Sequence, residues 1–321
     1  MHSRLIPVSD LPPTLWNATK RLMHLSPDLV GLWIETLQRN NLLVTAAGPA
    51  PQKGPVGGID KEATDEHLMW RFTGSAARVQ LAMLDPQSTM SQVADAFALI
   101  FSGGRVALAD LPCGSGAAIL SILSTLAELR RRELLPRQPL EIVFIGGEIS
   151  EHARQYTNEG LAAIKDALHE QAIVVESTIL RWDVCDALSN TDLIRNIVIR
   201  SDSCGARCIV IANFSDYLQR SGKWNDAQVQ LQELFRHARH DKSAVIWIEP
   251  KTNIVLSEGG FFARIGEWIS NKWANFIKMI SRESSDDVVA TSDAAVQHPL
   301  DMNRSFRVNL AVMRFDLHND A

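Results

Sequence analysis

The segment Val106-Ala-Leu-Ala-Asp-Leu-Pro-Cys-Gly-Ser-Gly116 decides which fold the sequence predicts. Its apolar start is typical of a buried strand, Asp110 closes that strand, and the apolar residues after Gly116 indicate a helix. Because glycine has no Cβ, Gly114 and Gly116 allow a tight turn and a close approach of the backbone to a ligand. The N-terminus of the following helix offers free N–H groups. The segment therefore predicts a ligand site at the carboxyl end of a strand in an α/β sheet.

Beyond this segment, short β-branched runs alternate with longer helical patterns. Strands are expected at 106–110, 140–145, 172–180, 207–212, 244–249 and 306–317. Helices are expected at 116–133, 151–171, 188–200, 226–239 and 261–280, with a polar loop at 281–303. Such alternation is typical of right-handed βαβ units. The predicted fold class is α/β, with a doubly wound, mostly parallel seven-stranded sheet and helices on both faces. The last strand is expected to be antiparallel, at or near the sheet edge.

The N-terminal third has a mainly helical pattern. Helices are expected at 11–24, from Pro27 after the N-cap Ser26, at 66–84 and at 91–101, with a short strand at 42–45. The stretch 46–58 is rich in Gly, Pro and Ala without periodicity, which indicates a linker. The sequence therefore predicts two domains, a small helical N-terminal lobe over 1–60 that is faintly like a winged helix, and a main domain over 61–321.

Composition excludes several function classes. The 321 residues carry a formal net charge of −5, which does not favour a nucleic-acid partner, and the only basic run is Arg130–Arg132. No apolar stretch approaches the roughly eighteen residues of a membrane span, and the N-terminus has no signal-peptide pattern. We therefore expect a protein without a membrane partner.

The cysteines and histidines show no metal-binding pattern. Of the four cysteines only Cys204 and Cys208 lie close in sequence, and two thiols do not complete a zinc or iron–sulfur ligand set. The histidines have no spacing that indicates a metal site. We expect reduced cysteines, no metal and a cytoplasmic location.

Two cofactor classes compete for the glycine-rich turn. A dinucleotide site needs Gly-x-Gly-x-x-Gly/Ala, and both registers fail, because the third glycine falls on Ile119 or the first on Pro112. The order Asp110-x-Pro-Cys-Gly-x-Gly instead resembles the first motif of class I S-adenosylmethionine-dependent methyltransferases, an acidic residue followed by x-Gly-x-Gly-x-Gly. Here Pro112 replaces the first glycine. The resemblance is specific in sequence only over Asp110–Gly116, and in topology it covers roughly 105–317.

The resemblance implies S-adenosylmethionine as the cofactor. Its motif places Asp110, Pro112, Cys113, Gly114 and Gly116 around that cofactor. The alternative that the residues themselves leave open is an ordinary tight turn between a strand and a helix.

Two later carboxylates follow in the order that the resemblance implies. Glu148 ends the strand pattern at 142–148, where a carboxylate in the family accepts both ribose hydroxyls. Asp183 matches the acceptor of the adenine amino group, with Trp182 or Val184 as the apolar cover of the ring. Glu148 has the alternative of a solvated loop carboxylate. Asp183 has a rival in Asp186, and either could merely cap the next helix.

The loop after the strand at 207–212 faces the methyl group and the acceptor in the family. Asn213 is therefore a candidate cofactor contact, although an asparagine after a strand is often a turn residue. Methyl transfer needs a general base only for an acceptor that is protonated at neutral pH, and Asp216 and Tyr217 are the candidates. Phe72 and Arg78 lie in the region that caps the cofactor in related folds.

The predicted function is S-adenosylmethionine-dependent methyl transfer to an acceptor that the sequence does not identify, whether small molecule, protein or RNA. The N-terminal lobe is the expected source of acceptor specificity or of homodimer contacts. One alternative is a catalytically inactive methyltransferase-like subunit for binding or sensing. Another, less favoured, is a nucleotide-binding oxidoreductase.

Overall fold

The computed structural model describes residues 4–51, 58–240, 242–252, 255, 260–262 and 289–317. Within these residues the strands form one nine-stranded sheet, in the order β1-β2-β8-β9-β7-β6-β3-β4-β5. The five strands from β7 to β5 pair parallel, and β9 pairs antiparallel with both β7 and β8. The strand bounds are β1 Trp16–Asn17, β2 Leu22–Met23, β3 Gly104–Asp110, β4 Leu140–Glu148, β5 Ile173–Arg181, β6 Ala206–Ala212, β7 Ser243–Glu249, β8 Ala290–Gln297 and β9 Ser305–Asp316.

Helices connect the parallel strands and precede the sheet. The α-helix bounds are α1 Pro27–Arg39, α2 Leu43–Ala47, α3 Lys61–Trp70, α4 Phe72–Leu84, α5 Ser91–Ile100, α6 Ala117–Arg131, α7 Glu151–Ala163, α8 Lys165–His169, α9 Ala187–Arg200, α10 Ser215–Arg220 and α11 Trp224–His237, and a 3₁₀ turn spans Val8–Asp10. The helices at 116–133, 188–200, 226–239 and 91–101 were predicted within a few residues of these bounds. The expected helix at 66–84 is interrupted at Arg71, which separates α3 from α4.

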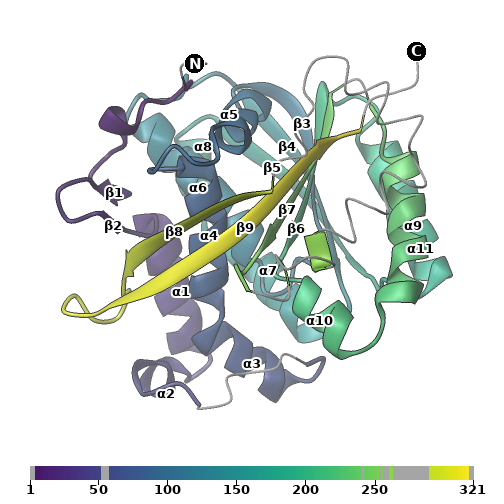
Figure 1. Cartoon of the computed structure of the whole chain (residues 1–321), viewed down its shortest axis with the longest axis horizontal. Helices are drawn as coiled ribbons and strands as arrows, with labels where there is room; N and C mark the ends of the chain where they lie inside the picture. Colours follow the sequence, from purple (N-terminus) through teal and green to yellow (C-terminus); the bar gives the residue numbers. More distant parts are fainter. Residues whose placement is uncertain are drawn as a thin grey trace.

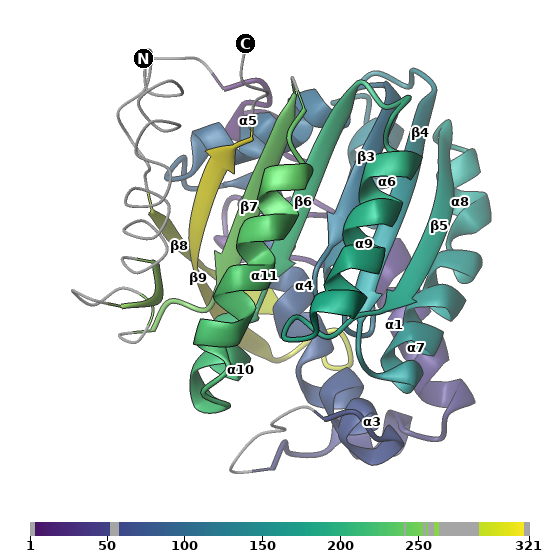
Figure 2. The same cartoon turned by 90° about the vertical axis from the view of Figure 1, so that its right-hand side faces the viewer.

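Each face of the sheet carries its own buried apolar cluster. Leu120 of α6 and Leu161 of α7 belong to the cluster that also contains residues of α1 and α4. Leu193 of α9 and Leu231 of α11 belong to the cluster on the other face, around Trp247. Figure 2 shows α9 and α11 in front of the sheet, with α4 and α6 behind it. Burial of the β-branched strand residues between these two layers is what favours a parallel sheet.

The α/β class and the mostly parallel sheet are as predicted, but the number of strands is not. The sheet has nine strands instead of seven, and β1, β2 and β8 are strands that the sequence did not predict (Figure 1). β8 lies in a stretch that we expected to be a polar loop. The last strand, β9, is antiparallel as expected, but it is internal to the sheet. The helix expected at 261–280 lies outside the described residues apart from 261–262.

The N-terminal region differs most from the prediction. The stretch 11–24 is a turn region with β1 and β2 in place of a helix, and Leu42–Thr45 begins α2 in place of a strand. This removes the pattern on which the likeness to a winged helix rested. Leu15 and Leu29 are buried in the same cluster as Leu120 of α6. A separate lobe over 1–60 stays a prediction.

The basic run at the end of α6 is used within the fold. Arg130 is buried and donates to backbone carbonyls, including that of Gln171 at 2.9 Å. Arg131 and Arg132 both pair with the carboxylate of Glu128. These residues therefore do not form an open basic patch. Across the described ranges, no helix has the length and apolar character needed to cross a membrane.

Candidate functional site

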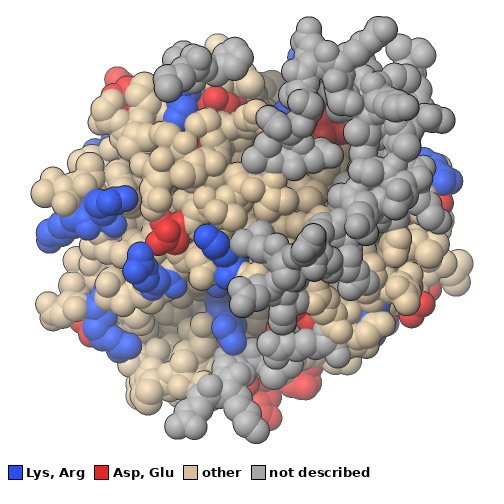
Figure 3. All heavy atoms as spheres, viewed as in Figure 1, with Lys and Arg blue, Asp and Glu red and all other residues tan. Residues whose placement is uncertain are grey.

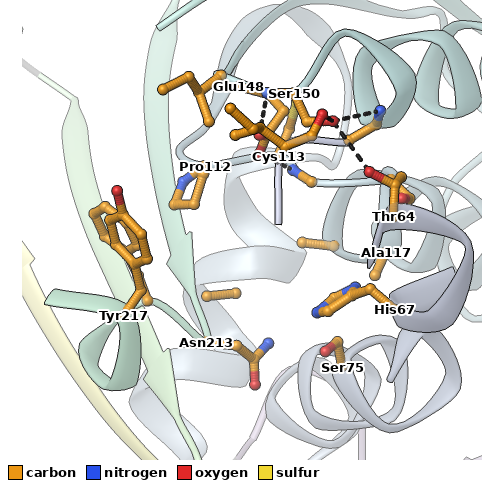
Figure 4. Close-up of a pocket in the computed structure, with 18 of the residues that line it drawn as sticks. Thr64, His67, Ser75, Pro112, Cys113, Ala117, Glu148, Ser150, Asn213 and Tyr217 are labelled. Carbon is orange, nitrogen blue, oxygen red and sulfur yellow. Dashed lines mark hydrogen bonds between the residues drawn. The ribbon is translucent and has the colours of Figure 1, made fainter. Parts of the chain in front are cut away.

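A cavity of about 270 Å³ lies at the carboxyl ends of β3, β4, β5 and β6. The strand order reverses between β3 and β6, and crevices at such a point are the usual ligand sites of α/β sheets. Eight of the predicted site residues line it: Pro112, Cys113, Gly114, Glu148, Trp182, Asp183, Asn213 and Tyr217. Figure 4 shows Pro112, Cys113 and Glu148 at one end and Asn213 at the other.

The two glycines of the turn have different roles. Gly114 lines the cavity with φ of +53°, and a Cβ built there would meet no atom within 4 Å. Gly116 does not line the cavity. It has φ of +84° at the N-terminus of α6, and a Cβ there would lie 3.0 Å from Leu120 and 3.2 Å from Thr157. Gly114 therefore leaves open space on the ligand side, whereas Gly116 allows α6 to pack closely against α7.

Glu148 joins the glycine turn to the next strand. Its Oε2 accepts a hydrogen bond from the Gly114 backbone N–H at 3.1 Å, and its Oε1 accepts one from Ser150 N–H at 2.8 Å. The side chain lines the cavity, and burial raises the pKa of its carboxyl group despite these hydrogen bonds. An ionised carboxylate has about four acceptor positions, so lone pairs remain for a ligand. Glu148 is not the solvated loop residue of the alternative interpretation.

Asp110 lies behind the cavity wall. It is fully buried, its Oδ2 accepts the Ile119 backbone N–H at 3.2 Å, and its Oδ1 has no hydrogen-bond partner among the described residues. Burial raises the pKa of Asp110 to about 8. The Asp110 side chain therefore holds the first turn of α6 through the Ile119 N–H. Of the motif residues Asp110, Pro112, Cys113, Gly114 and Gly116, only Asp110 and Gly116 do not line the cavity.

We expect Asp110→Asn to flatten the dependence of stability on pH. The pKa of Asp110 is about 8 in the folded protein against a usual 3.8, so between these values the unfolded chain releases a proton that the folded protein keeps. The free energy of unfolding that Asp110 contributes at low pH is therefore lost as the pH rises towards the folded pKa. Asparagine does not titrate, so the variant lacks this pH dependence. Urea unfolding at several pH values measures this, with the exposed Asp192→Asn as the control. Parallel stability curves for wild type and Asp110→Asn would contradict the prediction.

Asp183 and Asp186, between which the sequence could not choose, have different roles in the structure. Asp183 lines the cavity, and its Oδ1 accepts the Cys185 N–H at 3.0 Å. Asp186 is the N-cap of α9, where its side chain accepts the Leu188 N–H at 3.1 Å. Trp182 and Val184 flank Asp183, and both are buried and line the cavity. An acceptor and two apolar surfaces therefore face the same space.

The loop after β6 contributes the opposite wall. Asn213 has φ of +57°, lines the cavity and accepts at Oδ1 from Arg78 Nη1 at 3.0 Å. Tyr217 is 42% exposed and lines the cavity, its ring stacks on Phe214 at 5.7 Å, and its Oη accepts from Lys223 Nζ at 2.8 Å. Asp216 is exposed and does not line the cavity.

A buried carboxylate on β7 holds this loop. Glu249 is fully buried and accepts four hydrogen bonds, from the Phe214 N–H at 3.0 Å, the Ser215 N–H at 2.9 Å, the Ser215 Oγ at 2.8 Å and the Trp247 Nε1 at 2.8 Å. Burial raises the pKa of Glu249 despite these donors. The Glu-Pro ending of β7 therefore fixes the loop that carries Asn213 and Tyr217.

Sequence reasoning missed the residues that close the cavity from the N-terminal side. Thr64 and His67 of α3 and Ser75 of α4 line it, as does Phe72, whose region we expected to cap a cofactor. Thr64 Oγ1 lies 3.1 Å from the Ser150 Oγ, a hydrogen bond that ties α3 to the loop after β4. Burial, and then the charge of Arg71, lower the pKa of His67 to about 4, so its imidazole is neutral. No local signal marks these residues, since their place depends on the packing of α3 and α4 over the sheet.

Comparison of the sequence with known protein families and with curated proteins finds no match. Among the described residues, no group of three or more His, Cys, Asp or Glu side chains could hold a metal ion.

Proposed function

We propose that this protein is an S-adenosylmethionine-dependent methyltransferase. The observation that carries the proposal is the arrangement of Gly114, Glu148 and Asp183. They lie at the carboxyl ends of three strands that are neighbours in the sheet, β3, β4 and β5, and all three residues line one cavity. A nucleoside with an amino-acid tail needs a backbone without a Cβ, an acceptor for the ribose and an acceptor for the base. These residues offer those features in that order. We also propose that the sheet is doubly wound, as in class I methyltransferases.

The residues present fit this cofactor. The open space at the Cβ position of Gly114 leaves room for a ligand against the backbone. Glu148 would accept from the ribose with the lone pairs that its two backbone donors leave free. Asp183 would accept from the base between Trp182 and Val184. When bound, the cofactor supplies a methyl group on a sulfonium, which is transferred by in-line displacement.

The chain's own part in such a transfer is to align the reactants and to exclude water. The loop held by Glu249 places Asn213 and Tyr217 at the wall opposite the glycine turn. If the acceptor carries a proton, we propose Tyr217 Oη as the atom that holds or relays it. Lys223 Nζ keeps that oxygen oriented. Asp216 lies outside the cavity lining and is the weaker candidate. Acceptor specificity and dimer contacts from the N-terminal region stay proposals.

Calorimetry with S-adenosylhomocysteine tests the proposal. We expect the full chain to bind it, and to bind a nicotinamide dinucleotide far more weakly. No binding of S-adenosylhomocysteine to the folded protein would overturn the cofactor assignment. Binding without methyl transfer to any fraction of a cell extract would favour the alternative of a binding or sensing subunit.

The two aspartates of the loop after β5 provide a matched pair of variants. We expect Asp183→Ala to weaken binding of S-adenosylhomocysteine about ten-fold or more, because it removes a charged acceptor in the cavity. Asp186→Ala should leave that affinity unchanged and lower the free energy of unfolding by about 1 kcal/mol, because it removes the N-cap of α9. Calorimetry and urea unfolding measure the two effects. Equal losses of affinity in both variants would contradict the assignment.

A further inference from the structure

Arg78 is a cation that forms no ion pair with any residue in the described part of the chain. It lies on α4, where its Nε donates to the Asn309 carbonyl at 3.1 Å and its Nη1 donates to Asn213 Oδ1 at 3.0 Å. Both acceptors are neutral, and within the described ranges no carboxylate lies within ion-pair distance of the guanidinium. A guanidinium has five N–H donors in a planar fork, so several remain available.

The charge of Arg78 is compensated only in part. Glu249 attracts it electrostatically but forms no ion pair with it within the described residues, because the hydrogen bonds that Glu249 accepts come from the β6–α10 loop and Trp247. Burial, together with the neighbouring charge of Arg71, lowers the pKa of Arg78 to about 10, which leaves it protonated at neutral pH. The side chain is half-buried, and a charge that is partly removed from water is costly unless it is paired.

This charge adjoins the end of the cavity that lies opposite Glu148. Asn213, which Arg78 contacts, lines that end together with Ser75, one turn before Arg78 on the same face of α4. Figure 4 shows Asn213 and Ser75 there, with His67 beside them and with Glu148 on the far side. Arg78 does not itself line the cavity, but its guanidinium contacts the lining residue Asn213. An anion that reaches past Asn213 at this end would meet that guanidinium, beside the Ser75 hydroxyl and the neutral His67 imidazole.

The N-terminus of α6 offers a site for the methionine carboxylate of the proposed cofactor. Ala117 and Ala118 begin the fifteen-residue helix α6 and line the cavity next to Gly114. The first N–H groups and the dipole of a helix favour a negative charge. The proposed nucleoside contacts also lie on this side. On the proposed function, the methionine carboxylate would bind here, away from Arg78.

We propose that the methyl acceptor is an anion whose carboxylate or phosphate group binds Arg78 at the Asn213–Ser75 end of the cavity. This inference rests on the proposed function, because it names the substrate class of the same site. Arginine binds both groups through paired, charge-assisted hydrogen bonds. Lys and Arg side chains also gather on the face that carries β8 and β9 (Figure 3). Arg304 and Arg307 are exposed on or beside β9, with Arg307 paired to Asp293, and a surface rich in cations would attract an anion.

The test measures donor and anion binding separately. Wild type, Arg78→Met and Arg78→Lys are titrated with S-adenosylhomocysteine, and then, when saturated with it, with inorganic phosphate and with succinate. Arg78→Met keeps the apolar stem and removes the charge. Arg207→Met is the matched control, because Arg207 is also a buried guanidinium that donates to a carbonyl, at the amino end of β6 away from the cavity.

We expect Arg78→Met to bind S-adenosylhomocysteine like wild type, which also shows that the variant is folded. Its affinity for the probe anions should fall about ten- to hundred-fold, as expected for a lost hydrogen bond to a charged group. Arg78→Lys should bind phosphate with an intermediate affinity, because it keeps the charge but loses the paired donors, and Arg207→Met should bind phosphate like wild type. Phosphate bound without succinate would point to a phosphorylated acceptor, and the reverse to a carboxylic acid.

Three results would overturn the inference, and they are distinguishable. If wild type saturated with S-adenosylhomocysteine binds neither anion, or Arg78→Met binds them equally, the anion site is wrong while the proposed function stands. If Arg78→Met weakens S-adenosylhomocysteine but not 5′-methylthioadenosine, which lacks the amino-acid carboxylate, Arg78 serves the cofactor. If S-adenosylhomocysteine does not bind wild type at all, the proposed function fails and the inference fails with it.

Discussion

Glu148→Ala should lower the affinity for S-adenosylhomocysteine by about a hundred-fold or more. The variant removes the acceptor that we propose for two ribose hydroxyls, and each hydrogen bond to a charged group is worth about 1.5–3 kcal/mol. It also removes the acceptor of the Gly114 and Ser150 N–H groups, so the glycine turn loses its tie to β4. Both effects act on the same ligand, which makes this the largest loss of binding that we expect from one side chain. Calorimetry of the folded variant measures it.

Two further variants separate the contact from the support of the turn. Glu148→Gln keeps the shape and one acceptor oxygen, and we expect an intermediate affinity. Glu141→Ala removes an exposed carboxylate of the same strand, paired with Arg105, and should bind like wild type. If Glu148→Ala binds S-adenosylhomocysteine within about three-fold of the Glu141→Ala control, the carboxylate does not hold the ribose.

Glu249→Ala should produce the largest loss of stability, about 3 to 5 kcal/mol in the free energy of unfolding. The substitution leaves the N–H groups of Phe214 and Ser215 and the indole N–H of Trp247 without an acceptor in a fully buried site. Each unsatisfied buried group costs about 1–3 kcal/mol. Urea unfolding at constant pH measures the difference, with the exposed Glu233→Ala on α11 as the control.

Glu249→Ala should also change the conformation of the loop between β6 and α10. Because Glu249 fixes the residues between β6 and α10, its loss should also displace Asn213 and Tyr217 from the cavity wall. A loss of less than about 1 kcal/mol would mean that water or a rearranged loop satisfies these donors, and the role assigned to Glu249 would then be wrong.

The errors of prediction share one physical cause. β8 reads Ala-Thr-Ser-Asp-Ala-Ala-Val-Gln over Ala290–Gln297, with few large apolar residues, and it is a strand because its backbone pairs along β9. The stretch 11–24 has helical spacing, yet its backbone forms β1 and β2 because Leu22 and Met23 pair with β8. In each case a partner far along the chain decided the structure, and local propensity is too weak to resist it.

The sequence by itself determined the features that short-range sterics control. The alternation of strands and helices follows from periodicity, the turn at Gly114 and Gly116 requires positive φ, and the positions of Glu148 and Asp183 follow from where their strands end. Each of these depends on neighbours within one element, so each can be read from the residues alone.

Only the tertiary structure decided which of those residues share a cavity. It placed Asp110 and Gly116 behind the cavity wall and made Asp186 the N-cap of α9. It also packed α3 and α4 over the sheet. That packing carries His67 into the cavity and leaves Arg78 beside Asn213 without an ion pair among the described residues. The burial of a side chain and the charges around it depend on residues that are distant in the chain. A local sequence pattern therefore does not predict them.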